Sequence, residues 1–196
     1  DGLVNLSVVT GEFTISDCSS LLSLDGLSGL ETVENSMVIE ENSALEDLTG
    51  LSNLTWVERG LMISENSALT SMDGLDLLVY VGGLTVNSNP VLTSLGTLEN
   101  LTTIDGEIWV YENPGLTDID GLLSVTDAGS EIYIRHNDSL CAEDVETFRE
   151  ALLAGGWDYA FTNEHNAGEC PVDDDGSDSG DDGSGSEDDG SAEDDG

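Results

Sequence analysis

A repeat of about 24 residues runs through most of this chain and limits the folds that the chain can adopt. The repeated phrase is Leu/Ile-x-Ile/Val-x-x-Asn-x-x-Leu, and its central apolar positions are Ile15, Ile39, Ile63, Val86, Val110 and Ile134. Their successive spacings are 24, 24, 23, 24 and 24 residues. A period in this range is typical of solenoids, in which each coil buries its apolar side chains only against the neighbouring coils.

The pattern inside one repeat favours short strands over helices. Residues 50–69 read GLSNLTWVERGLMISENSAL, with Leu61 and Ile63 alternating across a short segment and Asn66 at the following corner. Alternation of period two between Gly, Asn, Asp and Ser corners is the signature of β-strands. We therefore expect a mainly β fold, a parallel β-solenoid of about six coils.

The asparagine of the phrase recurs at one place in each coil. We expect these side chains to turn inward and to satisfy backbone groups at the corners. The members of this asparagine ladder are Asn42, Asn66, Asn89, Asn113 and Asn137. Cys18 occupies the equivalent first position, where we expect a free, buried thiol in place of the amide.

The repeat ends in a segment with a different period. Val145, Phe148 and Leu152 recur at helical spacing within residues 142–154, and Gly155-Gly156 follows. Trp157, Tyr159 and Phe161 then alternate, which predicts a final strand. A solenoid needs a cap of this kind, because its last coil otherwise exposes apolar surface and strand edges.

Two of the three cysteines, Cys141 and Cys170, bracket this cap. We expect a disulfide between them, which would stabilise the fold by about 3–4 kcal/mol in the chain-entropy model. Zinc is the rival interpretation, but the sequence offers no C-x-x-C pair or third nearby ligand. The chain thus divides into solenoid repeats (1–141), a disulfide-clipped cap (142–172) and a tail (173–196).

Charge separates the tail from the rest and excludes several functions. Residues 173–196 contain only Asp, Glu, Gly, Ser and one Ala, with 12 acidic side chains. The remaining 30 acidic residues stand against three arginines and no lysine. Such acidity disfavours nucleic acids and anionic membranes as partners, and no apolar run approaches the ~20 residues of a membrane span.

The tail predicts a disordered, self-repelling linker. Its aspartates could associate weakly with Ca²⁺, but the ligand spacing of an EF-hand is missing. We therefore expect no cofactor and no specific metal site. We also expect a monomeric chain.

The repeat phrase, best seen in residues 50–69, resembles the receptor L domain, the leucine-rich β-helix of insulin and epidermal growth factor receptors and of bacterial and fungal cell-surface proteins. The resemblance covers about residues 1–141, and the phrase N-x-S-L-C at 137–141 strengthens it. It implies a right-handed β-helix with a binding role at the cell surface. The cysteine-rich modules and kinase of the growth-factor receptors have no counterpart in this sequence.

The sequence gives little support for catalysis. Neither G-x-S-x-G nor H-E-x-x-H occurs, and His136 and His165 stand alone among many carboxylates. We expect no enzymatic activity and no catalytic residues.

Recognition is better supported, because the strand register shows which side chains point outward. Trp109, Tyr111, Tyr133 and Arg135 fall on the outer face of two adjacent coils about 4.8 Å apart. Trp, Tyr and Arg dominate interface hot spots, although cross-strand stabilisation of an exposed sheet would place them there too. Trp56 and Tyr80 form a second outward pair without an arginine.

These observations predict a non-enzymatic binding or adhesion module that recognises an extracellular protein or a glycan. Disulfide use and acidity favour an extracellular or cell-surface location, such as a bacterial envelope. A structural spacer of the envelope is the first alternative. A polysaccharide-active β-helix enzyme is the second, and the scarcity of basic residues disfavours it.

Overall fold

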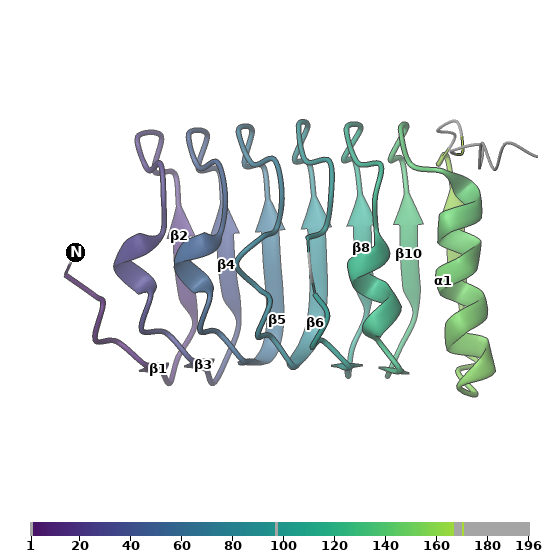
Figure 1. Ribbon diagram of the computed structural model, residues 1–196, viewed down its shortest axis with the longest axis horizontal. Coiled ribbons are helices and arrows are strands. Elements are labelled where there is room, and N and C mark those ends of the chain that lie inside the picture. Colours follow the sequence, from purple (N-terminus) through teal and green to yellow (C-terminus); the bar gives the residue numbers. More distant parts are fainter. Residues whose placement is uncertain (1, 97, 167–169, 171–196) are drawn as a thin grey trace, which may run out of the picture.

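The computed structural model describes residues 2–96, 98–166 and Cys170, so the predicted acidic tail at 173–196 lies outside the described residues. The chain forms a mainly β parallel solenoid with one α-helix, α1, near its C-terminal end. Figure 1 shows the strands side by side along the long axis, with α1 at one end and the N-terminus at the other.

One long row of parallel strands contains the central apolar residue of each repeat. Its members pair in the order of the chain: β2 (Phe13–Ser16), β4 (Met37–Glu40), the second half of β5 (Trp56–Ser64), the second half of β6 (Tyr80–Asn87), β8 (Ile108–Tyr111), β10 (Ile132–Arg135) and β11 (Phe161–Glu164). The register places Ile39 opposite Ile63 and Val86 opposite Val110, all fully buried. The predicted ladder of apolar residues is therefore present.

A second, shorter row forms another side of the solenoid. It contains β1 (Val8–Val9), β3 (Thr32–Val33), the first residues of β5 and β6, β7 (Thr103–Ile104) and β9 (Asp127–Ala128). Single bridges from Ser71 to Ser94 and from Ser94 to Asp118 mark a third side. Short 3-10 helices lie between corners at η1 (Asp25–Leu27), η2 (Thr49–Leu51) and η3 (Asp120–Ser124).

The asparagine ladder closes the coils from inside. Asn66 is fully buried; its Nδ2 donates to the Ile39 carbonyl at 2.9 Å, and its Oδ1 accepts from the Asn42 N–H at 3.1 Å. The other predicted members repeat these contacts with their own preceding coils. Asn166, which the sequence reasoning missed, continues the ladder by accepting from Asn137 N at 3.1 Å and donating to Ile134 O at 2.7 Å.

The residue before each ladder position has a left-handed backbone. These corner residues have φ between 55° and 57°: Asp17, Glu41, Glu65, Ser88, Glu112, His136 and His165. The left-handed region is uncommon for residues other than glycine, and its recurrence shows that every corner turns in the same way. Corner side chains of successive coils therefore form a row along one edge.

Three details differ from the sequence expectations. The solenoid makes about five full turns, slightly fewer than the expected six coils, because the six strands of the long row from β2 to β10 have five turns between them. Cys18 is free but exposed rather than buried. The final strand contains only Phe161 of the three alternating aromatics, since Trp157 packs into the core before it and Tyr159 is 52% exposed.

The cap closes one end of the core. Helix α1 (Ala142–Ala154) covers the last coil with Val145, Phe148 and Leu152, which are buried. Strand β11 then pairs in parallel with β10. The predicted disulfide joins Cys141, just before α1, to Cys170, with a sequence separation of 29 residues.

Candidate binding surface

Strands β8 and β10 bring together the four residues that the sequence singled out. Ile108, Val110, Ile132 and Ile134 face the core, and the residues between and after them face outward. The register sets Trp109 beside Tyr133 and Tyr111 beside Arg135. All four outward side chains are half-buried, and we call this group the aromatic–arginine patch.

The aromatic rings of the patch contact one another. Trp109 and Tyr133 are stacked, with ring centroids 3.9 Å apart and planes 14° from parallel. Tyr111 meets Trp109 edge to face, at a centroid distance of 6.2 Å and an angle of 76°. The three rings therefore form one continuous aromatic surface.

Arg135 is held by these rings rather than by a carboxylate. Its guanidinium carbon lies 5.7 Å from the Trp109 centroid and 5.9 Å from the Tyr111 centroid, within cation–π range. Within the described ranges the one ion pair joins Arg149 to Glu146, so no ion pair forms at Arg135. Its Nε is buried and has no hydrogen-bond partner there.

Carboxylates fix the polar edges of the stacked rings. Trp109 Nε1 donates to Glu107 at 2.8 Å, and the Tyr133 hydroxyl donates to Glu131. The hydrogen bond to Glu131 raises the pKa of Tyr133 above its usual range, and partial desolvation makes a smaller contribution in the same direction. These contacts preorganise the patch, but they also use polar groups that a ligand could otherwise bind.

A second stacked pair lies on the short row. The rings of Trp56 and Tyr80 are 3.9 Å apart and 12° from parallel. Trp56 Nε1 donates to Glu58, and the Tyr80 hydroxyl donates to Asp105, each at 2.7 Å. The bond to Asp105 raises the pKa of Tyr80 to about 12. No arginine lies over this pair among the cation–π contacts of the described residues, so it has the aromatic chemistry of the patch without the cation.

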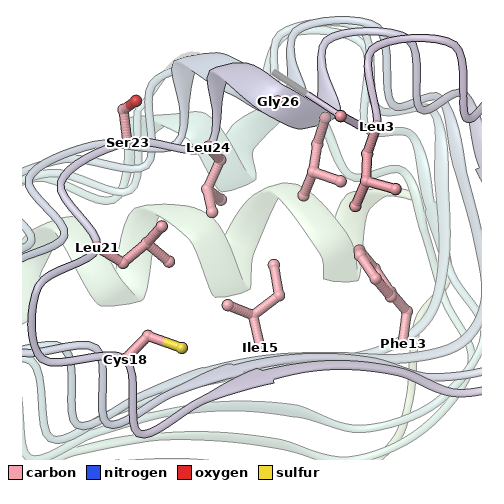
Figure 2. A pocket seen from close by; sticks show the side chains of 10 residues that line it. Leu3, Phe13, Ile15, Cys18, Leu21, Ser23, Leu24 and Gly26 are labelled. Atoms are coloured by element: carbon pink, nitrogen blue, oxygen red, sulfur yellow. The ribbon is translucent and has the colours of Figure 1, made fainter.

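The N-terminal end of the solenoid is a separate feature. A cavity of about 390 Å³ opens at the first coil, and Figure 2 shows Leu3, Phe13, Ile15, Leu21 and Leu24 lining it, with the Cys18 thiol at its edge. The thiol donates to the Ser16 carbonyl at 3.2 Å. At this end, no described residue covers the apolar interior.

Groups that could hold a metal by three close donors are few. Among the described residues, Cys141, Glu143 and Cys170 form the one such group, and its sulfurs belong to the disulfide instead of being free thiolates. The fold also brings His136 and His165 into contact, which the sequence reasoning had not anticipated. The signal was present as Arg-His-Asn at 135–137 and Glu-His-Asn at 164–166.

In the part of the chain that the structure describes, no helix is both long and apolar enough to cross a membrane. Comparison of the chain with protein-family models, with curated proteins and with solved structures finds no match.

Proposed function

We propose that this protein is a non-enzymatic extracellular binding module that contacts a protein partner through the aromatic–arginine patch. The observation that carries this proposal is the convergence of Trp109, Tyr111, Tyr133 and Arg135 into one preorganised surface. Trp, Tyr and Arg dominate interface hot spots, and the aromatic side chains among them lose little conformational entropy on binding because they have only two side-chain torsions. The disulfide supports an oxidising, extracytoplasmic compartment.

Ring orientation favours a protein partner over a glycan. Trp109 and Tyr133 each have one face covered by the other ring, and Tyr111 and Trp109 meet edge to face. Sugar rings commonly pack on an open aromatic face, whereas protein side chains also pack well against ring edges. The guanidinium over the rings would then pair with a carboxylate or carbonyl of the partner.

The surrounding charge suggests what else the partner carries. Glu107 and Glu131 flank the patch, and the chain has a formal net charge of −39. A partner with basic groups around its contact surface would be steered toward this face, and the association rate would fall as salt increases. An acidic polysaccharide would be repelled.

A structural spacer is the second candidate function. It is favoured by the internal hydrogen bonds from Trp109 to Glu107 and from Tyr133 to Glu131, which need no ligand to explain them. The same arrangement of stacked rings and carboxylates at Trp56 and Tyr80 also supports the spacer function.

We also propose, from the repeat phrase alone, that the chain is related to the receptor L domain.

An array of extracellular proteins and glycans, probed with the full chain with and without Ca²⁺, tests these functions. We expect capture by a protein, and loss of that capture in the double variant Trp109→Ala/Tyr133→Ala. The matched control is Trp56→Ala/Tyr80→Ala, which removes the same two aromatic types from an equally stacked pair and should leave capture intact. Far-UV circular dichroism of both variants should match the wild type.

Two outcomes would contradict the proposed role. Equal loss in both double variants would show that the patch acts only through stability. Absence of any captured ligand by the wild-type chain would favour the spacer.

A further inference from the structure

The two histidines of the chain, His136 and His165, lie side by side in the folded structure. They are 29 residues apart in the sequence and belong to different parts of the fold, the last full coil and the cap. Their rings are stacked, with centroids 4.5 Å apart and planes 13° from parallel, and both side chains are exposed.

The backbone holds the two imidazoles in equivalent places. Each histidine occupies the left-handed corner of its coil with a φ of 56°. The His136 N–H donates to the Glu164 carbonyl at 3.0 Å, and the next residues are joined by the bond from Asn137 N to Asn166 Oδ1 at 3.1 Å. The spacing of the two histidine backbones is therefore set by the ladder, and it brings the two imidazoles within reach of each other.

Carboxylates lie beside one member of this pair, His136. Glu112 is the corner residue of the preceding coil, and together with Pro114, His136 and Asp138 it lines an open hollow of about 340 Å³. No described third donor lies near enough to both imidazoles to complete a preformed three-ligand set. Water, or one of these carboxylates after rotation of its side chain, would fill the remaining positions.

We propose that His136 and His165 together bind one divalent transition-metal ion, such as Ni²⁺, Cu²⁺ or Zn²⁺, across the junction between the last coil and the cap. Imidazole nitrogen suits these metals, which it ligates at about 2.0–2.1 Å. The two ring planes are 13° from parallel, so both imidazoles must tilt or rotate to direct a nitrogen toward a shared ion. Their exposure leaves room for that rotation.

Metal preference distinguishes this site from nonspecific binding of cations by the acidic surface. The many carboxylates of the chain attract any cation, but Ca²⁺ prefers oxygen ligands and gains little from imidazole. A metal held by two histidines from separate segments would also connect the last coil to the cap, as a cross-link additional to the disulfide. Because the two rings are adjacent only in the folded chain, such an ion would raise the thermal midpoint.

The test is a calorimetric and thermal-unfolding titration of the full chain with Ni²⁺ at about pH 8, because protons compete with metal ions for ligand nitrogens. We expect one site per chain and a rise of a few degrees in the thermal midpoint. His136→Asn and His165→Asn should each weaken binding at least about 10-fold, which corresponds to about 1.4 kcal/mol. Asn is chosen because it tolerates the left-handed corner.

Two controls exclude other ligands. Cys18→Ser should leave Ni²⁺ binding unchanged, since the exposed Cys18 follows β2, at the opposite end of the long row from β10 and β11. Ca²⁺ should have the same effect on the wild type and on the double histidine variant. Unchanged Ni²⁺ affinity in that double variant, or no Ni²⁺ binding by the wild-type chain, would overturn the site.

Discussion

The carboxamide of each ladder asparagine serves the coil before its own. Asn42 donates to Ile15 O at 2.9 Å and accepts from Cys18 N at 3.2 Å, both in the first coil. The described residues supply no such backbone groups for a carboxamide at position 18. Because each carboxamide bonds to the coil before its own, the first described coil does not require an asparagine at position 18, and Cys18 is exposed there.

Two substitutions test this direction. Asn66→Ala should reduce the free energy of unfolding by about 2–5 kcal/mol, because it leaves the buried Asn42 N–H without this partner and removes the hydrogen bond to the Ile39 carbonyl. Cys18→Asn should change it by less than about 0.5 kcal/mol. Denaturant unfolding of both variants measures the difference. Similar losses at both positions would mean that the carboxamides act mainly within their own coils.

The row of corner carboxylates should make stability depend on pH. The charge of Asp17, and a hydrogen bond with it, raises the pKa of Glu41 above its ordinary 4.5, and Glu65 adds to the effect. A carboxyl whose pKa is higher in the folded chain stabilises the fold below its ordinary pKa, and this stability is lost as pH rises through the raised value.

Glu41→Gln removes the central charge of this row. We expect a small rise in the thermal midpoint at pH 7, where the repulsion is present, and no rise at about pH 4, where the wild-type carboxyl is largely protonated. Thermal unfolding across this range checks the expectation. Asp47→Asn, which lies outside the row, is the matched loss of one charge. A rise at pH 4 as large as at pH 7 would exclude relief of repulsion as the cause.

At the scale of elements, the repeat predicted the strands of the long row from β2 to β10, and the change of period after it predicted the cap helix. The positions of Ile39, Ile63 and Val110 follow from alternation, and α1 follows from the spacing of Val145, Phe148 and Leu152. The outward side of Trp109 and Tyr133 was equally predictable, because register follows from a fixed period. Their 3.9 Å stacking was not, since it depends on side-chain rotation.

The features that the sequence pattern did not reveal lie where the 24-residue repeat is interrupted. Asn166 follows its predecessor by 29 residues rather than 24, because α1 is longer than the segment it replaces. That offset also concealed the contact of His136 with His165. Trp157 resembled a strand residue by alternation, but its indole N–H donates to the Ser130 carbonyl at 3.2 Å from a non-strand segment.

Neighbouring glycines of β6 give a prediction about how closely its coils approach. A Cβ on Gly82 would lie 2.5 Å from the Glu58 carbonyl oxygen and 2.6 Å from that of Arg59, both backbone atoms. A Cβ on Gly83 would meet nothing nearer than 3.5 Å. Gly82→Ala should therefore destabilise the protein by about 1–3 kcal/mol or more, whereas Gly83→Ala should be nearly neutral or slightly stabilising. Denaturant midpoints measure both, and equal losses would refute the close approach of β5 to β6 at Gly82.

At the scale of the whole molecule, the two ends of the solenoid are unequal. The C-terminal end is covered by α1 and β11 and closed by the disulfide. The N-terminal end opens into the apolar cavity of the first coil. Because the coils of a solenoid contact only their neighbours, stability at each end depends on what covers it.

Local unfolding should therefore begin at the first coil. Native-state hydrogen exchange measures this, and we expect the amides of β2 to exchange at least about 10-fold faster than those of β10. Cys170→Ser, which opens the disulfide, should accelerate exchange in α1 and β11 while leaving β2 unchanged. Cys18→Ser is the matched loss of a sulfur at the other end and should leave α1 and β11 unchanged. Equal rates in β2 and β10 would instead show that the coils open only together, and that the uncovered end does not weaken the first coil.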